Sequence, residues 1–407
     1  MTSTRPYPAA LAYEALLDPA HRHDPYPCFA ELAAEPIQRI GEHRWVVSRH
    51  ADITALLRDP RLSAQDELEG DPPPGSDGRP FRGPFLKVDP PHHDTLREQA
   101  MHQFMPRVLG LGPRIEAMVG ALLDRHRSTG PGELDVVTAL AYPLPVAVIC
   151  ELLGVPAEEE PVFHSFAERL TRALDPVETL SAQERADLQG TLADWRAYLL
   201  PMIAQRHDRP GPDLVSGLLT AGDPETRMNT VELASTLGLL LIAGHETTVN
   251  LIANGTLALL RHPEVLDRLR ADPGLAPAVV EEVLRYDPPV QLTARRATAD
   301  LRVAGRVVPA GDDVLLLLAA GNRDPRRFAD PDRFWPQRPG NAHLAFGGGV
   351  HYCFGAALAR MEGQAALSAI ATRLANPRLA VDPPPYRANM LLRGPARLRI
   401  AFDAVTG

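Results

Sequence analysis

Apolar residues recur with helical periodicity through the middle of the chain, from about residue 95 to 285. Intervals of three and four residues place such side chains on one face of an α-helix. The clearest repeats lie in Pro113–Arg127, Leu144–Leu153, Gln183–His207 and Thr230–Arg261. The pattern therefore predicts a mainly α-helical protein.

Short runs typical of β-strands lie on both sides of this helical region. They are Arg44–Ser48, Leu301–Val303, Val307–Val308 and Leu398–Ala401. Because the runs are short and far apart in the chain, we expect a small sheet assembled from distant segments. No Ser/Gly linker or shift in composition marks a boundary, so we interpret residues 1–407 as a single domain.

Composition and charge narrow the classes of function. The formal charge of -9 and the pI near 5.9, with no basic run to offset them, argue against a nucleic-acid-binding protein. Met1–Pro6 lacks the apolar core of a signal peptide, and no stretch approaches the ~20 apolar residues that cross a bilayer. We therefore expect a cytoplasmic protein without a membrane segment.

The three cysteines, Cys28, Cys150 and Cys353, are far apart and form no CxxC pair, so neither a disulfide framework nor a zinc site is expected. Cys353 stands in the glycine-rich run Phe346–Ala356, just before the strong helix formers Ala357–Glu362. Backbone N–H groups and the helix dipole would stabilise a thiolate there and lower its pKa, as a metal ligand requires. The cysteine alone is also compatible with a buried apolar residue in a loop.

The run from Phe346 to Gly355 resembles the FGxGxHxCxG signature of the cytochrome P450 family, with every specified position filled. The resemblance implies that Cys353 is the axial ligand of a haem b iron, where the sulfur pushes electron density that favours O–O cleavage. It also implies that His351 bonds a haem propionate, and that Phe346 and Gly347 belong to the cofactor-binding loop. A plain surface histidine is the alternative for His351.

Thr230–Arg261 would form a helix ~48 Å long at 1.5 Å per residue, enough to cross a whole domain. Its apolar stretch Leu237–Ile242 predicts burial, yet the polar run Ala243–Thr248 follows directly. Burying such groups without partners costs a few kcal/mol, so a compensating role is expected. A glycine beside threonines is also where the hydrogen-bond ladder of a helix can open and admit water, which would make a proton path.

The polar run matches the family motif AGx(D/E)T(T/S), with Ala243 and Gly244 expected beside the cofactor. The resemblance implies that Thr247 hydrogen-bonds the bound oxygen and that Glu246 helps to relay protons to it. The alternative is that Glu246 serves only as the partner of a neighbouring arginine.

Glu282 and Arg285 are three residues apart and share one helical face, where an ion pair can form. The pair resembles the ExxR element of the P450 family, which joins a buried arginine network near the cysteine loop. By the same resemblance Arg338 is the third member, although Trp335 replaces the aspartate that is usual in that segment. The role implied for these residues is structural.

The run DPPHHDTLR, which ends at Arg97, resembles the family's DPPxHxxxR segment and aligns His93 and Arg97 with its propionate-binding pair. Arg295 fills the position of another propionate arginine. Several cations are required because an uncompensated buried carboxylate is very costly. The immediate neighbours His92 and Arg296 are the alternatives.

The resemblance runs from about residue 24 to the C-terminus and implies the cytochrome P450 fold, a mostly helical triangular domain with haem b between the long helix and the cysteine-bearing helix. The implied activity is a monooxygenase that inserts one atom of O2 into a C–H bond. Because the chain is too short for a fused reductase, electrons would arrive from a separate ferredoxin or flavodoxin; we expect a monomer. One alternative is an H2O2-dependent peroxygenase, which usually lacks an acid–alcohol pair such as Glu246–Thr247. Another is a non-enzymatic haem-thiolate sensor, and a third is a structural protein, which would bind no haem.

The walls of a substrate pocket are expected from residues 66–86, 163–182, 239–247, 290–293 and 390–391. The candidate contacts are Leu239, Ala243, Val290, Gln291, Leu292, Met390 and Leu391. Most are apolar, which favours a hydrophobic small molecule from bacterial secondary metabolism, such as a terpenoid, a polyketide or a carrier-bound intermediate. Gln291 would orient a polar group, or would simply face solvent from a strand.

Overall fold

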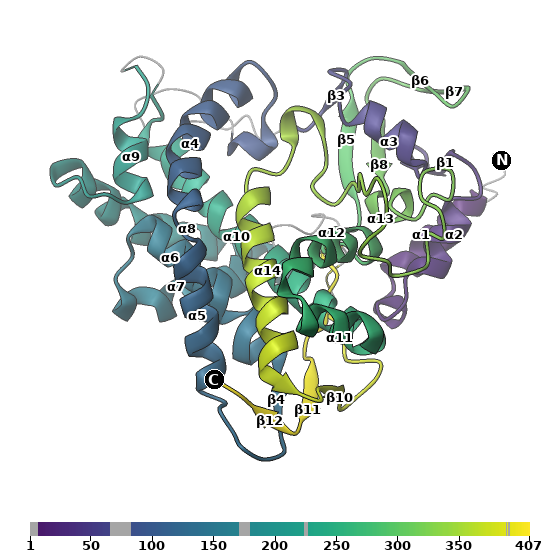
Figure 1. Ribbon diagram of the computed structural model, residues 1–407. Helices are drawn as coiled ribbons and strands as arrows, with labels where there is room; N and C mark the ends of the chain where they lie inside the picture. Colours follow the sequence, from purple (N-terminus) through teal and green to yellow (C-terminus); the bar gives the residue numbers. More distant parts are fainter. Residues whose placement is uncertain (1–6, 66–82, 171–179, 224–226, 388, 390) are drawn as a thin grey trace.

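A computed structural model describes residues 7–65, 83–170, 180–223, 227–387, 389 and 391–407. In Figure 1 the molecule has a roughly triangular outline, with helices over most of its area and a sheet at one corner. This arrangement confirms the predicted fold class, mainly α with a small β region. Met390 and much of the expected pocket wall at 66–86 and 163–182 lie outside the described residues.

The helices account for most of the described chain. They are α1 (Pro8–Leu17), α2 (Tyr26–Leu32), α3 (His50–Leu56), α4 (His92–Leu109), α5 (Gly112–Asp124), α6 (Pro143–Leu153), α7 (Glu160–Leu170), α8 (Ala182–Asp208), α9 (Leu214–Thr220), α10 (Thr230–Arg261), α11 (Pro263–Ala271), α12 (Ala276–Tyr286), α13 (Leu318–Gly321) and α14 (Ala356–Arg373). A π-helix, Val137–Ala141, leads into α6. The four helices predicted from periodicity correspond to α5, α6, α8 and α10, and the bounds of α10 match the prediction.

Local capping explains why α10 begins where it does. The Asn229 side chain accepts hydrogen bonds from the backbone N–H groups of Val231 and Glu232, and the Glu232 carboxylate accepts one from the Asn229 backbone in return. This capping box satisfies backbone donors that would otherwise lack partners at the helix start. The start of α10 is therefore encoded by four adjacent residues.

The strands form several small sheets rather than one. They are β1 (Ile37–Gly41), β2 (Arg44–Val47), β3 (Leu62–Ser63), β4 (Gly132–Asp135), β5 (Thr293–Ala297), β6 (Leu301–Val303), β7 (Arg306–Val308), β8 (Asp313–Leu316), β9 (Leu374–Ala375), β10 (Arg378–Leu379), β11 (Arg399–Phe402) and β12 (Ala404–Val405). The largest sheet has the order β1-β2-β8-β5-β3, in which β2 and β8 are parallel. The single-sheet prediction is wrong in part, because β6 and β7 pair only with each other and β11 pairs with β10 and β4.

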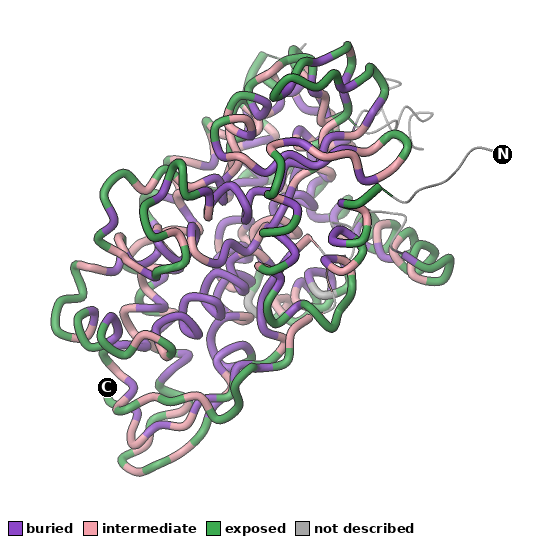
Figure 2. The backbone as a smooth tube through the Cα atoms, turned by 90° about the vertical axis from the view of Figure 1, so that its right-hand side faces the viewer, coloured by how far each residue is buried: buried purple, intermediate pink, exposed green. Residues whose placement is uncertain are grey.

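Helix α10 crosses the centre of the molecule and is packed by α6, α8, α12 and α14. Figure 2 shows the buried chain gathered along this central region and the exposed residues outside it. By length and composition α10 could cross a membrane, contrary to the sequence expectation. However, 72% of its most apolar window is buried inside the protein, as in the core helix of a globular domain.

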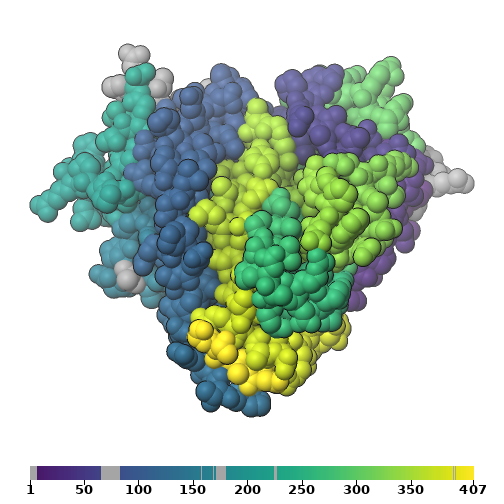
Figure 3. Space-filling model, in the orientation of Figure 1, coloured from purple at the N-terminus to yellow at the C-terminus, as the bar shows by residue number. Residues whose placement is uncertain are grey.

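Helix α14 follows the cysteine loop and lies beside α10, with which it makes extensive contact. On the face shown in Figure 3, α14 occupies the middle of the surface, between the blue segment of α4 and α5 and the green segment of α11 and α12. The fold thus places the loop that precedes α14 between the central helix and the surface.

Candidate active site

The glycine-rich loop before α14 requires glycine at particular positions. Gly347 and Gly349 have φ angles of +68° and +65°, which L side chains rarely adopt. A Cβ on Gly349 would also lie 2.2 Å from the carbonyl oxygen of Leu57. Within this loop the backbone N–H of Cys353 donates to the carbonyl oxygen of Phe346 at 2.9 Å. This bond holds Phe346, at the start of the motif, next to Cys353, and it places the sulfur just before α14.

The Cys353 thiol does not have the lowered pKa that the sequence predicts. Burial raises its pKa, and a hydrogen bond from the Gly355 backbone and the charges of Arg97 and Arg360 offset this only in part. The prediction considered the helix terminus but not the loss of water around the sulfur. A coordinated metal cation would add the missing positive charge, since coordination deprotonates a thiol outright. The donor set therefore fits a metal-thiolate bond rather than a free reactive cysteine.

A second set of polar contacts lies beside the loop. Arg360 Nε donates to Glu281 Oε1 at 2.6 Å, and its guanidinium lies 4.5 Å from the centre of the Phe346 ring. His343 Nε2 lies 3.2 Å from the other oxygen of Glu281. These contacts tie α12 to α14 behind the cysteine loop. The sequence alone does not reveal these contacts, because Glu281 adjoins the recognised Glu282 and no local pattern points to its partners.

Glu281 makes the stability of this region depend on pH. Burial raises the pKa of its carboxyl group, but the hydrogen bonds from His343 and Arg360 outweigh burial and lower the pKa to about 2. A carboxyl with a depressed folded-state pKa adds stability above its unfolded value, ~4.3, which is lost as pH falls toward 2. We expect Glu281→Gln to flatten the acid limb of the free energy of unfolding in urea titrations between pH 5 and 2. An acid limb as steep as that of the unaltered protein would contradict this.

Two histidines meet on the other side of the cysteine loop. His93 in α4 is 1% exposed, and its ring centre lies 4.5 Å from that of His351. Among the described residues, neither His93 Nε2 nor His351 Nδ1 has a hydrogen-bond partner. Buried polar atoms normally have one. These two nitrogens therefore fit an acceptor that comes from outside the chain.

The charges around the two histidines favour an anion. Arg97 Nη2 donates to the Tyr352 carbonyl oxygen at 2.6 Å, and Arg295 Nη1 donates to the Ala294 carbonyl oxygen at 2.7 Å. Burial lowers the pKa of both arginines, and it lowers the pKa of His351 to about 4 with help from the positive charges of Arg295 and Arg97. Two carboxylates lie nearby: Asp94 Oδ1 is 2.8 Å from His93 Nδ1, and Asp89 Oδ1 is 4.0 Å from His351 Nε2. The cluster still offers two arginine cations and free ring nitrogens, which suit the carboxylates of a cofactor edge.

The rival residues have other partners. His92 Nε2 lies 3.3 Å from a carboxylate oxygen of Glu232, at the start of α10. Arg296 Nε donates to Asp313 at 3.2 Å, on the outer side of the large sheet. The structure therefore brings His93 and Arg295, rather than these neighbours, into the cluster with His351.

One face of α10 remains partly accessible in the middle of the molecule. Ala243, Gly244 and Thr247 are half-buried, whereas most residues on either side are buried. The helix is continuous here, and Thr247 Oγ1 donates to the Ala243 carbonyl oxygen at 2.6 Å. The expected opening of the backbone ladder is therefore not seen, because this hydroxyl bonds to the carbonyl one turn earlier without displacing its backbone donor.

Glu246 is 2% exposed and forms an ion pair with Arg387, from the C-terminal part of the chain. The partner foreseen as an alternative is therefore present, although it lies far away in sequence. Its neighbour His245 is fully buried, and burial lowers its pKa to about 3, so the ring is neutral at neutral pH. No local signal points to Arg387, since the contact depends on how the C-terminal segment packs on α10.

The structural ion pair is present as predicted. Glu282 and Arg285 are fully buried, and two hydrogen bonds of 2.8 Å join the carboxylate to the guanidinium. The remaining N–H groups of Arg285 donate to the backbone oxygens of Asn322, Pro331 and Arg333. Arg338 completes the network from 3.5 Å. The cluster pins α12 to the irregular chain that leads into the cysteine loop.

The expected substrate contacts are brought together only in part. Val290 pairs with Leu392, and the backbone N–H of Gln291 donates to the Leu391 carbonyl oxygen at 3.1 Å. The Gln291 side chain is buried and donates to the Pro288 carbonyl oxygen, so the solvent-facing alternative is wrong. Leu292 packs in the N-terminal core, which accounts for its burial without a ligand. Leu239 lies one turn before Ala243 on α10.

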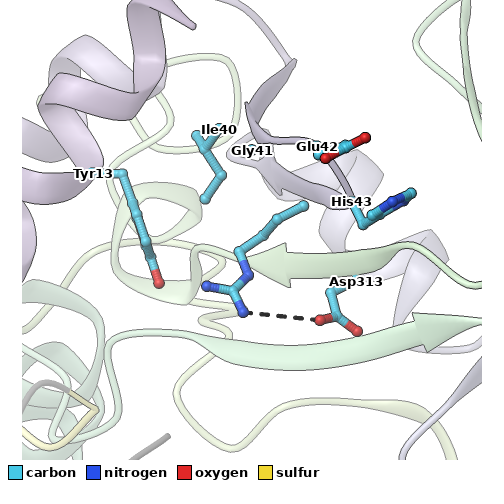
Figure 4. A pocket seen from close by; sticks show the side chains of 7 residues that line it. Tyr13, Ile40, Gly41, Glu42, His43 and Asp313 are labelled. Carbon is cyan, nitrogen blue, oxygen red and sulfur yellow. Dashed lines mark ion pairs between the residues drawn. The ribbon is translucent and has the colours of Figure 1, made fainter. Parts of the chain in front are cut away.

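A separate surface cleft of about 250 Å³ lies at the N-terminal sheet, and Figure 4 shows it with the Arg44–Asp313 ion pair at 4.0 Å. It is lined by Tyr13, Ile40, Gly41, Glu42, His43, Arg44 and Asp313. None of the residues of the candidate active site takes part in it.

A comparison with protein families matches the cytochrome P450 model over residues 78–273 and 274–400. The chain belongs to the cytochrome P450 family. Among curated relatives, the cytochrome P450 monooxygenase PikC of Streptomyces venezuelae is 39% identical over 93% of this chain and 91% of its own. The 6-deoxyerythronolide B hydroxylase of Saccharopolyspora erythraea is 35% identical over 93% and 96%.

Among solved structures, ligand-free CYP164A2 of Mycobacterium smegmatis superposes with a TM-score of 0.86 and 41% identity, covering 96% of this chain and 99% of that one. The protein is thus a cytochrome P450 monooxygenase, an oxidoreductase with a haem-thiolate cofactor. P450 enzymes of this bacterial type use O2 and a redox partner and bind hydrophobic substrates.

This P450 departs from the family pattern at Trp335, and the structure shows what the residue does. Its backbone N–H donates to Glu282 Oε1 at 2.7 Å, so the main chain of Trp335 gives the carboxylate a hydrogen bond. Its ring centre lies 5.4 Å from the guanidinium carbons of both Arg333 and Arg338. The aromatic face thus contacts cations of the network, where a carboxylate is usual.

Proposed function

We propose that this P450 binds haem b and inserts one atom of O2 into a C–H bond of a hydrophobic small molecule. The observation that carries the proposal is the half-buried Cys353 in its glycine loop, with the unpartnered nitrogens of His93 and His351 nearby. A thiol that can ligate iron and a nearby cluster that can bind carboxylates are the two kinds of contact that an iron porphyrin would need.

In this proposal Cys353 ligates the iron, and His93, Arg97, Arg295 and His351 hold the propionates. Haem, when bound, supplies the activation of O2, with the thiolate favouring O–O cleavage. The chain's own task at this side is to neutralise two carboxylates that would be costly to bury alone. The half-buried Arg295 and the buried histidines supply that compensation.

Thr247, on the half-buried face of α10, would lie beside the O2 that the haem activates. The Thr247 hydroxyl has one O–H, which donates to the Ala243 carbonyl oxygen, and lone pairs that can accept a hydrogen bond. It would donate to O2 after turning away from that carbonyl oxygen, and its lone pairs could then accept the next proton. Glu246, one residue earlier, is the group that would renew this proton. The pair would thus deliver protons at a fixed place and limit the release of partly reduced oxygen.

The substrate is proposed to lie against the accessible face of α10, near Leu239, Ala243, Val290 and Leu391. PikC is named as a monooxygenase and another relative as a hydroxylase of 6-deoxyerythronolide B. These names support a natural product of bacterial secondary metabolism as the substrate class. We further propose a cytoplasmic monomer that receives electrons from a separate ferredoxin or flavodoxin.

Replacing Thr247 by valine tests the proposal, because valine keeps the shape and removes the hydroxyl. With a compound that shifts the haem spin state and a ferredoxin-reductase pair, we expect product per NAD(P)H to fall by about tenfold or more, since positioned proton transfer contributes about 10²–10⁴-fold. The lost electrons should appear as hydrogen peroxide.

Thr256→Val is the matched control, since the Thr256 hydroxyl also donates to the carbonyl one turn earlier but lies in the buried part of α10 away from Thr247. The control should keep its ratio of product to NAD(P)H. Unchanged coupling in Thr247→Val, together with efficient product formation from added H2O2, would favour a peroxygenase. No product with any partner would favour a sensor.

A further inference from the structure

The Glu246 carboxylate is buried and faces a cation rather than the alcohol next to it. Its ion-pair partner is Arg387, whose side chain is 17% exposed and so extends from the carboxylate toward the surface. Thr247, in contrast, directs its hydroxyl to the Ala243 carbonyl oxygen. The position of the acid is therefore set by a residue outside α10.

Arg387 stands on a C-terminal hairpin, of which the described residues 385–387 and 391–396 form the two arms and contact α10. The Arg387 backbone N–H donates to the Gly394 carbonyl oxygen at 3.3 Å, and Tyr386 pairs with Pro395. One turn beyond Glu246 on α10, a Cβ on Gly394 would lie 2.1 Å from Asn250 Oδ1, so the two segments are in close contact. The hairpin cannot shift freely along the helix.

A second contact between α10 and the hairpin lies one turn further along the helix, at Asn254. Asn254 Nδ2 donates at 3.1 Å to the carbonyl oxygens of both Asp287 and Arg393. Glu246, Asn250 and Asn254 follow one another at four-residue spacing, so a buried polar stripe of α10 faces the hairpin. The hairpin's backbone is thus docked on this stripe, with Arg387 opposite Glu246.

The same hairpin leads to the expected substrate contacts. The Leu391 carbonyl oxygen accepts from the Gln291 backbone, and Leu392 pairs with Val290. A single short segment therefore touches both the candidate pocket wall and the candidate proton-relay acid. Its docking on α10 sets the distance between the two.

We propose that Arg387 is a positioning residue that holds the Glu246 carboxylate as an anion in one place, so that Glu246 can pass protons on toward Thr247. This inference rests on the proposed relay role of Glu246. Without the guanidinium, a carboxylate buried here would take up a proton and keep it, because an uncompensated buried charge is too costly. A group that does not release its proton no longer relays.

The test is a double-mutant cycle on the holoenzyme with Glu246→Gln, Arg387→Gln and the double variant. We expect each single change to lower product per NAD(P)H by about tenfold, with the double variant no worse than Glu246→Gln alone, because Arg387 acts only through Glu246. The dissociation constant of the spin-shifting compound should change less than twofold. Arg387→Lys should restore part of the coupling, and Arg378→Gln, which breaks an exposed ion pair with Asp403, should leave it unchanged.

A second measurement does not depend on turnover. Removing one partner of a buried ion pair strands the other charge, so Arg387→Gln should lower the thermal midpoint by roughly 5 °C, and the double variant should recover much of the loss.

The outcomes separate the role of Arg387 from that of Glu246. If Glu246→Gln lowers product per NAD(P)H and Arg387→Gln does not, or if their effects simply add, the role of Arg387 is overturned while the relay role of Glu246 stands. If Glu246→Gln leaves coupling intact, the relay role itself is lost and the inference with it. A stability loss in Arg387→Gln without uncoupling would show a merely structural arginine.

Discussion

Glu282→Gln is expected to lower the free energy of unfolding by about 3–5 kcal/mol, because it breaks a buried ion pair. Most of the purified protein molecules should then fail to retain haem. The change removes one charge at nearly constant volume. It leaves Arg285, which is fully buried, and Arg338, which is 6% exposed, without their shared anion. Glutamine also keeps only one of the two oxygens that accept from Arg285 Nε and from the Trp335 backbone N–H, so one of these two donors would lose its acceptor. Urea unfolding and the haem content per chain measure both consequences.

Asp267→Asn is the matched control for this prediction. Asp267 and Arg270 have the same three-residue spacing in the preceding helix, but the Asp267 side chain is 70% exposed. Exposed pairs of this kind contribute little, so the free energy of unfolding should change by less than about 1 kcal/mol. Equal losses in the two variants would mean that burial does not govern the strength of the Glu282–Arg285 pair.

Cys353→His is expected to abolish product formation, the largest effect on activity. Histidine can ligate haem iron, but it lacks the electron donation of a thiolate that favours O–O cleavage. The loop itself should survive, because the Cys353 contact with Phe346 is made by the backbone. Turnover is measured as product formed per haem with the spin-shifting compound.

Cys28→Ala controls for the loss of a buried thiol. Cys28 packs in the N-terminal core, and burial raises the pKa of its thiol as it does for Cys353. Turnover of Cys28→Ala should match that of the unaltered enzyme. Normal product formation by Cys353→His would remove the sulfur from the mechanism altogether.

Features that depend on neighbouring residues could be predicted from the sequence. The bounds of α10 follow from an unbroken apolar repeat and from a capping box at Asn229 and Glu232. The glycine loop follows from a dense motif, in which Gly347 and Gly349 adopt φ angles that suit glycine. The Glu282–Arg285 pair needs only one helical turn. In each case the cause and the consequence lie within a few residues.

Features that depend on tertiary packing could not be predicted. The ion pair of Glu246 with Arg387 arises because a distant hairpin docks on α10. The pKa of Cys353 moves opposite to expectation because burial, which a sequence does not display, outweighs the helix terminus. The separation of β6 and β11 into different sheets likewise depends on pairing between remote strands. Such contacts have no local signal.

The absorption spectrum of the ferrous carbonyl complex of the purified, unaltered enzyme reports which atom ligates the iron. We expect the long-wavelength maximum typical of a thiolate ligand, and in Cys353→His the shorter wavelength of histidine ligation. A short-wavelength maximum in the unaltered enzyme, or an identical spectrum in Cys353→His, would contradict the assignment of Cys353 as the axial ligand.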